Sequence, residues 1–132
     1  MGDAMFPQAP RATVTLLERL GHEVFFPRQQ ACCGQMHINT GYFEDALPLI
    51  KNHVKTFHPI LDGAWDAIVV PSGSCAGSIK HQQAMVASKL ADQKLANRAA
   101  IIAENTYDLP LLLTDFLGIE DVGAYFPHSL TY

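Results

Sequence analysis

Charged side chains are scarce in this sequence, and no run of Lys or Arg occurs. Of 132 residues, 17% are charged and 48% are hydrophobic, and the formal net charge is -4 at pH 7. Such a composition is typical of a compact globular core rather than of a disordered chain. Without a basic patch, binding to nucleic acid or to an anionic membrane surface is not expected.

Long apolar runs and targeting signals are also missing. No apolar run approaches the length that a bilayer crossing requires, so no membrane span is expected. Residues 1–4 lack the basic segment followed by an apolar one that marks a signal peptide. At this length we expect a single domain. Without a targeting signal we expect a cytoplasmic protein.

Two common catalytic motifs are absent as well. No Gly-x-Gly-x-x-Gly follows a predicted strand, and no Gly-x-Ser-x-Gly occurs. A dinucleotide site and a hydrolase nucleophile elbow are therefore not expected.

Cysteine is rare, but its placement is informative. The three cysteines are Cys32, Cys33 and Cys75. Adjacent cysteines rarely bridge each other, because a disulfide between them strains the intervening peptide. Without an export signal the reducing cytosol is the default compartment, and cysteine groups there more often serve metal or redox chemistry than structural disulfides.

Helical and strand patterns alternate along the chain. This alternation predicts an α/β fold with a small, Rossmann-like, mainly parallel sheet flanked by helices. The predicted helices span residues 10–20, 41–57, a segment that begins at Ser72 or Ser74, about 83–104, and 107–117. The predicted strands span 22–26 and 65–70, and 128–132 has the pattern of the beginning of another. The large aromatic residues expected in the core are Phe25, Phe26, Phe57 and Trp65.

The order of these elements suggests that the domain continues beyond this sequence. A parallel α/β unit usually opens with a strand before its first helix, yet only residues 1–8 precede the helix at 10–20. The strand predicted at 128–132 is expected to be cut short where the sequence ends. We therefore expect the fold to appear truncated at both ends.

The cysteines are expected to meet at one edge of the sheet. Cys32 and Cys33 follow one predicted strand, and Cys75 follows another. In open α/β sheets the loops at the carboxyl ends of the strands converge and bind ligands. Gly34 allows the backbone a positive φ, or a close approach to a bulky inorganic group. Thiolates favour iron–sulfur clusters, zinc or copper(I).

The histidines carry less information. His37 lies four residues after Cys33 and is a candidate nitrogen ligand, although an ordinary loop histidine is the favoured interpretation. The others show no mutual spacing typical of a metal site and are expected at the surface: His22, His53, His58, His81 and His128.

The motif at residues 32–35, Cys-Cys-Gly-Gln, followed by Ile-Asn-Thr-Gly-Tyr at 38–42, resembles the cysteine-rich CCG-domain family. Further matching stretches lie at 16–21, 71–75 and 121–124, so the resemblance covers nearly the whole chain. The family includes the iron–sulfur subunits of lactate utilisation and of glycolate oxidase, and the cysteine-rich chain of heterodisulfide reductase. The resemblance implies a single cysteine-rich domain over residues 1–132, forming the N-terminal half of a longer two-domain protein.

The resemblance also implies a cofactor. Family domains are described by one cysteine, then Cys-Cys-Gly, then Cys-x-x-Cys, and members are associated with [4Fe-4S] clusters. Carried over, the metal ligands are Cys32, Cys33 and Cys75, and Gly34 belongs to the cofactor site. The sequence departs from the pattern at Ser72, which replaces the first cysteine of Cys-x-x-Cys, and the upstream cysteine would align just before Met1. Four thiolates cannot be assembled from these residues, so an absent or incomplete cluster is expected in this chain alone.

The implied function is electron transfer in a complex that oxidises L-lactate to pyruvate, with the oxidising site elsewhere. The implied partners are other subunits of a lactate or glycolate oxidation complex and a second CCG domain of the same protein. The iron–sulfur chain of a glycolate oxidase is an alternative. From the residues, two further alternatives stay open: a thiol–disulfide or heterodisulfide site at Cys33 or Cys75, and a zinc module that adds His37 to the three cysteines. Whether the chain is itself an enzyme also stays open.

Overall fold

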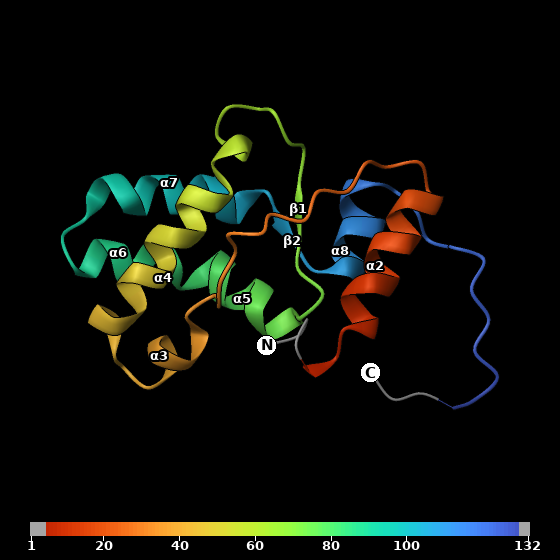
Figure 1. Ribbon diagram of the computed structural model, residues 1–132, viewed down its shortest axis with the longest axis horizontal. Coiled ribbons are helices and arrows are strands. Elements are labelled where there is room, and N and C mark those ends of the chain that lie inside the picture. Colours follow the sequence, from red (N-terminus) through yellow and green to blue (C-terminus); the bar gives the residue numbers. More distant parts are fainter. Residues whose placement is uncertain (1–4, 130–132) are drawn as a thin grey trace.

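Two short parallel strands lie between two groups of helices in the computed structural model, which describes residues 5–129 (Figure 1). The helices are α2 (Gln8–Arg19), α3 (Gln35–Asn39), α4 (Phe43–Thr56), α5 (Gly73–His81), α6 (Gln83–Lys89), α7 (Gln93–Glu104) and α8 (Leu109–Leu111), with a 3-10 turn η1 (His58–Ile60) and a π-helical turn η2 (Leu112–Phe116). The strands are β1 (Ile68–Val69) and β2 (Thr106–Tyr107). Helices α3 to α7 lie on one side of the strands, and α2 and α8 on the other (Figure 1).

The sheet confirms the α/β fold class but is small. Ile68 lies opposite Thr106 and Val69 opposite Tyr107, in parallel register. The amide of Ile68 donates to Asn105 O at 2.8 Å. The path from β1 to β2 runs through α5, α6 and α7, the crossover that parallel strands require. The strand predicted at 65–70 is thus present, but shorter than expected.

The strand predicted at 22–26 is wrong. Residues 23–26 form no backbone hydrogen bond with the described part of the chain, and within that part β1 pairs with β2 alone. An extended segment becomes a strand only where a neighbour satisfies its N–H and C=O groups. Phe25 and Phe26, expected in the core, are 58% and 56% exposed. A cavity of about 480 Å³ lies between this segment, α2, β1 and η2.

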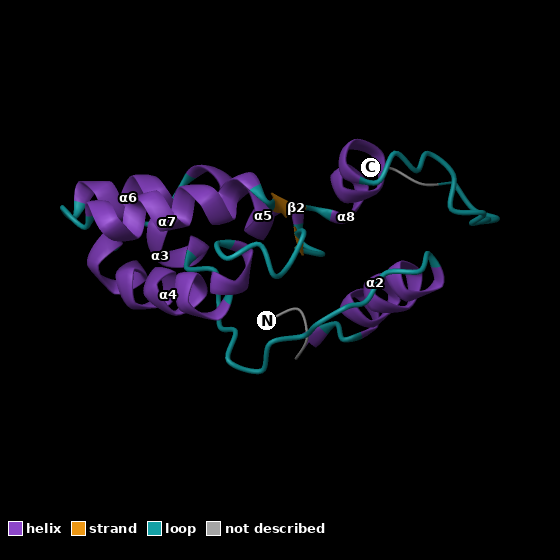
Figure 2. Ribbon diagram, turned by 90° about the horizontal axis from the view of Figure 1, so that it is seen from above, coloured by secondary structure: helices purple, strands orange, loops and turns teal. Residues whose placement is uncertain are grey.

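The main core lies on the side of α3 to α7. Helix α4 packs against α6 and α7, and Figure 2 shows α6 and α7 lying over α3 and α4. Ile50, Val86 and Ile102, one from each of α4, α6 and α7, are 0% exposed. The helix predicted at 41–57 is confirmed as α4, because its apolar residues recur at helical spacing and face this core. The helix predicted at 10–20 is confirmed as α2.

The single helix predicted at 83–104 is wrong, because α6 and α7 are separate. Ala91 has a φ of 59°, a left-handed conformation that interrupts a right-handed helix. Asp92 then begins α7: its side chain accepts a hydrogen bond from the amide of Leu95 at 3.1 Å. Aspartate is a favoured helix N-cap, and here it outweighs the continuous run of helix-forming residues.

The helix predicted at 107–117 is also only partly right. Tyr107 belongs to β2, and Asp108 caps the turn that follows by accepting a hydrogen bond from the amide of Leu111 at 3.0 Å. Helix α8 and η2 occupy the rest of the segment. Of the strand predicted at 128–132, residues 128–129 are not a strand, and 130–132 lie outside the described residues.

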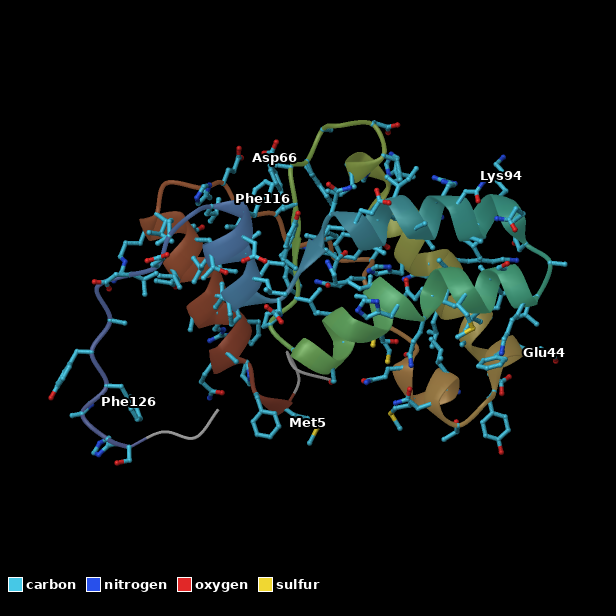
Figure 3. The ribbon with its side chains drawn as sticks, turned by 180° about the vertical axis from the view of Figure 1, so that it is seen from behind. Met5, Glu44, Asp66, Lys94, Phe116 and Phe126 are labelled. Atoms are coloured by element: carbon cyan, nitrogen blue, oxygen red, sulfur yellow. The ribbon has the colours of Figure 1, made fainter. Side chains whose placement is uncertain are left out.

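The segment after η2 extends away from the helices, and Phe126 lies on it, 57% exposed (Figure 3). Met5, at the opposite end of the described chain, is 63% exposed. No helix between residues 5 and 129 is long and apolar enough to span a membrane.

Candidate functional site

Cys33 is held at the start of α3 and faces the core. Gly34 occupies the helix N-cap with a φ of 86°, a conformation that glycine adopts without strain. The amide of Ile38 donates to Gly34 O at 3.1 Å and closes the first turn of α3. Only 9% of Cys33 is exposed, and it belongs to the same buried cluster as Ile50. The positive φ predicted for Gly34 is confirmed.

Cys75 lies in the first turn of α5, just after β1. The prediction that a helix begins at Ser72 is confirmed, since Ser72 is the N-cap residue of α5. Its hydroxyl lies 3.3 Å from the Ser74 hydroxyl and makes no capping bond to the helix backbone. Cys75 is half-buried and packs against the core cluster that contains Cys33.

The structure brings Cys33 and Cys75 together across 41 intervening residues. The pKa of the Cys33 thiol is raised from 9.0 to about 12. Burial is the largest cause, and a backbone hydrogen bond from Gln35 opposes part of the rise. The nearby Cys75 side chain and the charges of Cys75 and Cys32 raise the Cys33 pKa further. Cys33 is therefore protonated at neutral pH, and binding a metal ion there would release a proton.

Cys32 and His37 do not join Cys33 and Cys75. Both are exposed, and no group of three or more His, Cys, Asp or Glu side chains in residues 5–129 is arranged to hold a metal ion. His37 instead supports the local fold through its backbone, because its carbonyl accepts a hydrogen bond from Tyr42 N at 2.9 Å. This arrangement does not favour the zinc module with His37 as fourth ligand.

Two buried polar residues next to the cysteine loop, residues 32–34, were not identified from the sequence. Gln83, at the start of α6, is 1% exposed, and its Nε2 donates to Cys33 O at 2.9 Å. His53, on α4, is 7% exposed, so the prediction that it lies at the surface is wrong. Burial lowers the pKa of His53 to about 4, although the nearby Gln83 side chain opposes part of this shift. The ring centroids of His53 and Phe57 are 4.7 Å apart, so His53 packs against an aromatic side chain.

The cavity near α2 is separate from the cysteine site. Its described walls include Phe25, Trp65 and Phe116, and none of the three cysteines. Phe25 and Trp65 stack with ring centroids 6.0 Å apart and planes at 13°. The chemistry of the thiol pair therefore does not extend into this cavity.

Replacing Gly34 with alanine is expected to destabilise the protein by about 1–2 kcal/mol, the cost of a left-handed conformation in a residue with a Cβ atom. The added Cβ would lie 3.7 Å from Leu49 Cβ, an ordinary contact, so the cost comes from the backbone. Urea denaturation measures the change. Gly77→Ala is the matched control, because Gly77 lies inside α5 without a positive φ and with open space around it. Alanine is expected to stabilise that position by about 0.5–1 kcal/mol, and equal losses in both variants would contradict the account of Gly34.

The comparisons with known proteins agree with the residues at this site. The model of a family described as CCG, a cysteine-rich domain, matches residues 1–80, a range that contains all three cysteines and Gly34. Lactate utilization protein A of Geobacillus sp. (strain WCH70) is 38% identical over 130 residues, which are 98% of this chain and 51% of that protein. The protein of the same name from Bacillus subtilis (strain 168) is 41% identical over 114 residues, 86% of this chain and 44% of that protein.

A third relative carries no functional name. Uncharacterized protein YkgE of Escherichia coli (strain K12) is 39% identical over 124 residues, 94% of this chain and 49% of that protein. The chain thus spans about half the length of these curated relatives. No solved structure matches it.

Proposed function

Because the chain belongs to the cysteine-rich CCG domain family, we propose that it is one cysteine-rich domain of an iron–sulfur electron-transfer subunit in lactate utilisation. The observation that carries this proposal is that Cys33 and Cys75 pack in the same core cluster, close enough for the Cys75 side chain to raise the pKa of the Cys33 thiol. Cysteine thiols are the donors that iron–sulfur clusters use, and here they come together from separate parts of the chain. Two relatives named for lactate utilization supply the substrate class.

The donor set fits part of a cluster site. Cys33 and Cys75 fit two of the four thiolate positions of a [4Fe-4S] cluster, and exposed Cys32 is a third candidate. Gly34 lets the backbone turn so that Cys33 faces Cys75. In this proposal the remaining ligands come from outside residues 5–129, from a second cysteine-rich domain of the same polypeptide. The length of the curated relatives, about twice this chain, supports that arrangement.

A bound cluster would supply one-electron transfer, and this chain's role is to hold and orient its thiols. Oxidation of L-lactate to pyruvate releases two electrons and two protons, and we assign that step to partner subunits. The three cysteines are free, which fits a reducing compartment and supports a cytoplasmic location.

The test is the iron and acid-labile sulfide content of the complete polypeptide, purified without oxygen. We expect Cys33→Ser and Cys75→Ser each to lose the iron and sulfide of one cluster, because serine oxygen is a poor ligand for this chemistry. Ser74→Ala, a change at an exposed neighbour of Cys75, is the control and should keep the full content. Zinc in place of iron, or unchanged iron in both cysteine variants, would contradict the proposal. The chain alone should hold less than one full cluster, since its donor set is incomplete.

The same proximity supports a second candidate, a dithiol–disulfide site at Cys33 and Cys75. Its weakness is the raised pKa of Cys33, because the thiolate is the attacking form in thiol–disulfide exchange. Absence of iron absorption from the complete polypeptide, together with rapid alkylation of one cysteine at neutral pH, would favour this candidate over the cluster.

A further inference from the structure

Gln83 connects α6 to the cysteine loop through a buried hydrogen bond. Its Nε2 donates to Cys33 O at 2.9 Å, and the two residues are 50 positions apart in the sequence. With 1% of Gln83 exposed, this bond is shielded from water. A buried amide costs free energy unless it is hydrogen-bonded, so the contact with Cys33 O offsets a cost that an apolar side chain would not incur.

The other end of the Gln83 amide lies at a second buried polar group. Gln83 is close enough to His53 to raise the pKa of the imidazole, but the contact falls short of hydrogen-bond geometry. Gln83 Oε1 and both ring nitrogens of His53 therefore lack a hydrogen-bond partner within residues 5–129. A leucine or methionine would remove the unsatisfied Gln83 Oε1, but it would also remove the bond to Cys33 O. Buried polar atoms without partners need an explanation.

The bond to Cys33 O restrains the peptide group that follows the Cys33 side chain. Cys33 O belongs to the peptide group that joins Cys33 to Gly34, and a glycine restrains the orientation of that group less than a residue with a Cβ atom would. Fixing the carbonyl removes this freedom. Cys75 on α5 and Gln83 on α6 come from consecutive helices joined at Gln82, so one helical unit both packs Cys75 against the cluster that contains Cys33 and bonds to the Cys33 carbonyl.

We propose that Gln83 is a positioning residue that keeps the Cys33 thiol against the Cys75 thiol by holding Cys33 O. The functional meaning of this role rests on the proposed function, in which the two thiols act on a shared ligand. Its geometric content does not depend on a cluster, and the test below uses metal-free protein.

The probe is phenylarsine oxide, which binds two neighbouring thiols with loss of one water: the arsenic–oxygen double bond is replaced by two As–S bonds, and the thiol protons leave with the oxygen. No oxidant or reductant is needed. The parent protein carries Cys32→Ser, so that the adjacent Cys32–Cys33 pair cannot bind the probe. We expect Gln83→Met to raise the dissociation constant of the arsenical by at least about tenfold, equal to about 1.4 kcal/mol.

The matched control is Gln93→Met, because Gln93 is an exposed glutamine whose Nε2 bonds only to neighbouring Asn97 at 2.8 Å in the described chain. Its dissociation constant should stay within about twofold of the parent, within the range expected of surface substitutions. Thermal unfolding is measured for every variant, because a purely structural role of Gln83 would lower the midpoint without changing arsenical binding. If Gln83→Met does not fold, Gln83→Asn takes its place, since its amide is one methylene too short to reach Cys33 O, and the same loss is expected.

A folded Gln83→Met protein with parental affinity would overturn the proposal, and so would a parent that fails to bind the arsenical. Failure of the proposed function looks different: the complete polypeptide would hold no iron while Gln83→Met still weakened arsenical binding. The two failures are therefore distinguishable.

Discussion

Replacing Ile102 with alanine is expected to lower the free energy of unfolding by about 3–4 kcal/mol, within the range measured for large-to-small changes in protein cores. Ile102 is 0% exposed and belongs to the buried cluster between α4, α6 and α7. The substitution removes three carbon atoms and leaves a cavity, since helices on several sides prevent collapse. Urea denaturation followed by circular dichroism measures the loss as a lower midpoint.

The adjacent residue supplies a control of the same chemistry. Ile101 also lies on α7 but is 45% exposed, so Ile101→Ala removes the same atoms from a half-solvated position. The gain in helix propensity from isoleucine to alanine offsets part of the lost burial, and the net change should stay within about 0.5 kcal/mol. Equal losses at the two positions would show that α7 does not present the face that carries Ile102 to the core.

The difference between Ile101 and Ile102 illustrates what sequence patterns can predict. Apolar residues at helical spacing predicted α2 and α4 with nearly their observed bounds, because a helix that buries one stripe leaves that spacing in its sequence. The same spacing continues across Ala91, and the break between α6 and α7 depends on one left-handed residue and one capping aspartate. Local backbone conformation of this kind leaves no trace in a periodic pattern.

The strands show a different limit. An apolar run predicts that a segment can be a strand, but hydrogen bonds to a neighbour decide whether it becomes one. Residues 68–69 have such a neighbour in β2. Residues 24–26 are also apolar, but 23–26 have no backbone partner within the described chain, and Phe25 and Phe26 remain exposed.

At the candidate site, topology predicted the pairing of thiols but not the residues around them. The meeting of Cys33 and Cys75 followed from both residues being placed after predicted strands, although the first of those strands is an irregular segment. Gln83 and His53 lie 50 and 20 positions from Cys33 and belong to no motif. Their burial follows from the packing of α4 against α6, a tertiary contact that a single sequence does not encode in a readable pattern.

The burial of His53 predicts an acid-sensitive fold. The pKa of His53 is lowered from 6.5 to about 4 by burial, so the folded protein resists protonation of this ring while the unfolded chain accepts it. Above about pH 6.5 neither state is protonated and His53 contributes no pH dependence. As the pH falls from 6.5 towards 4, the unfolded state gains a proton that the folded state lacks, and stability is lost. Between pH 7 and pH 4.5 this loss should reach about 2–3 kcal/mol, at about 1.4 kcal/mol per pH unit.

His53→Leu is expected to remove this part of the pH dependence, and urea denaturation of both proteins from pH 7 to pH 4.5 measures it. The carboxylates contribute equally to both curves, so the difference between the curves isolates His53. His81→Gln is the control, because His81 lies exposed in the last turn of α5 and its loss should leave the wild-type slope unchanged. The raised pKa of Cys33 acts in another window: it favours the folded state below pH 9.0 and that contribution is lost at higher pH, so it does not disturb the comparison. Parallel curves for wild type and His53→Leu would mean that the imidazole is solvated, and that the polar pair behind the cysteine loop is open to water.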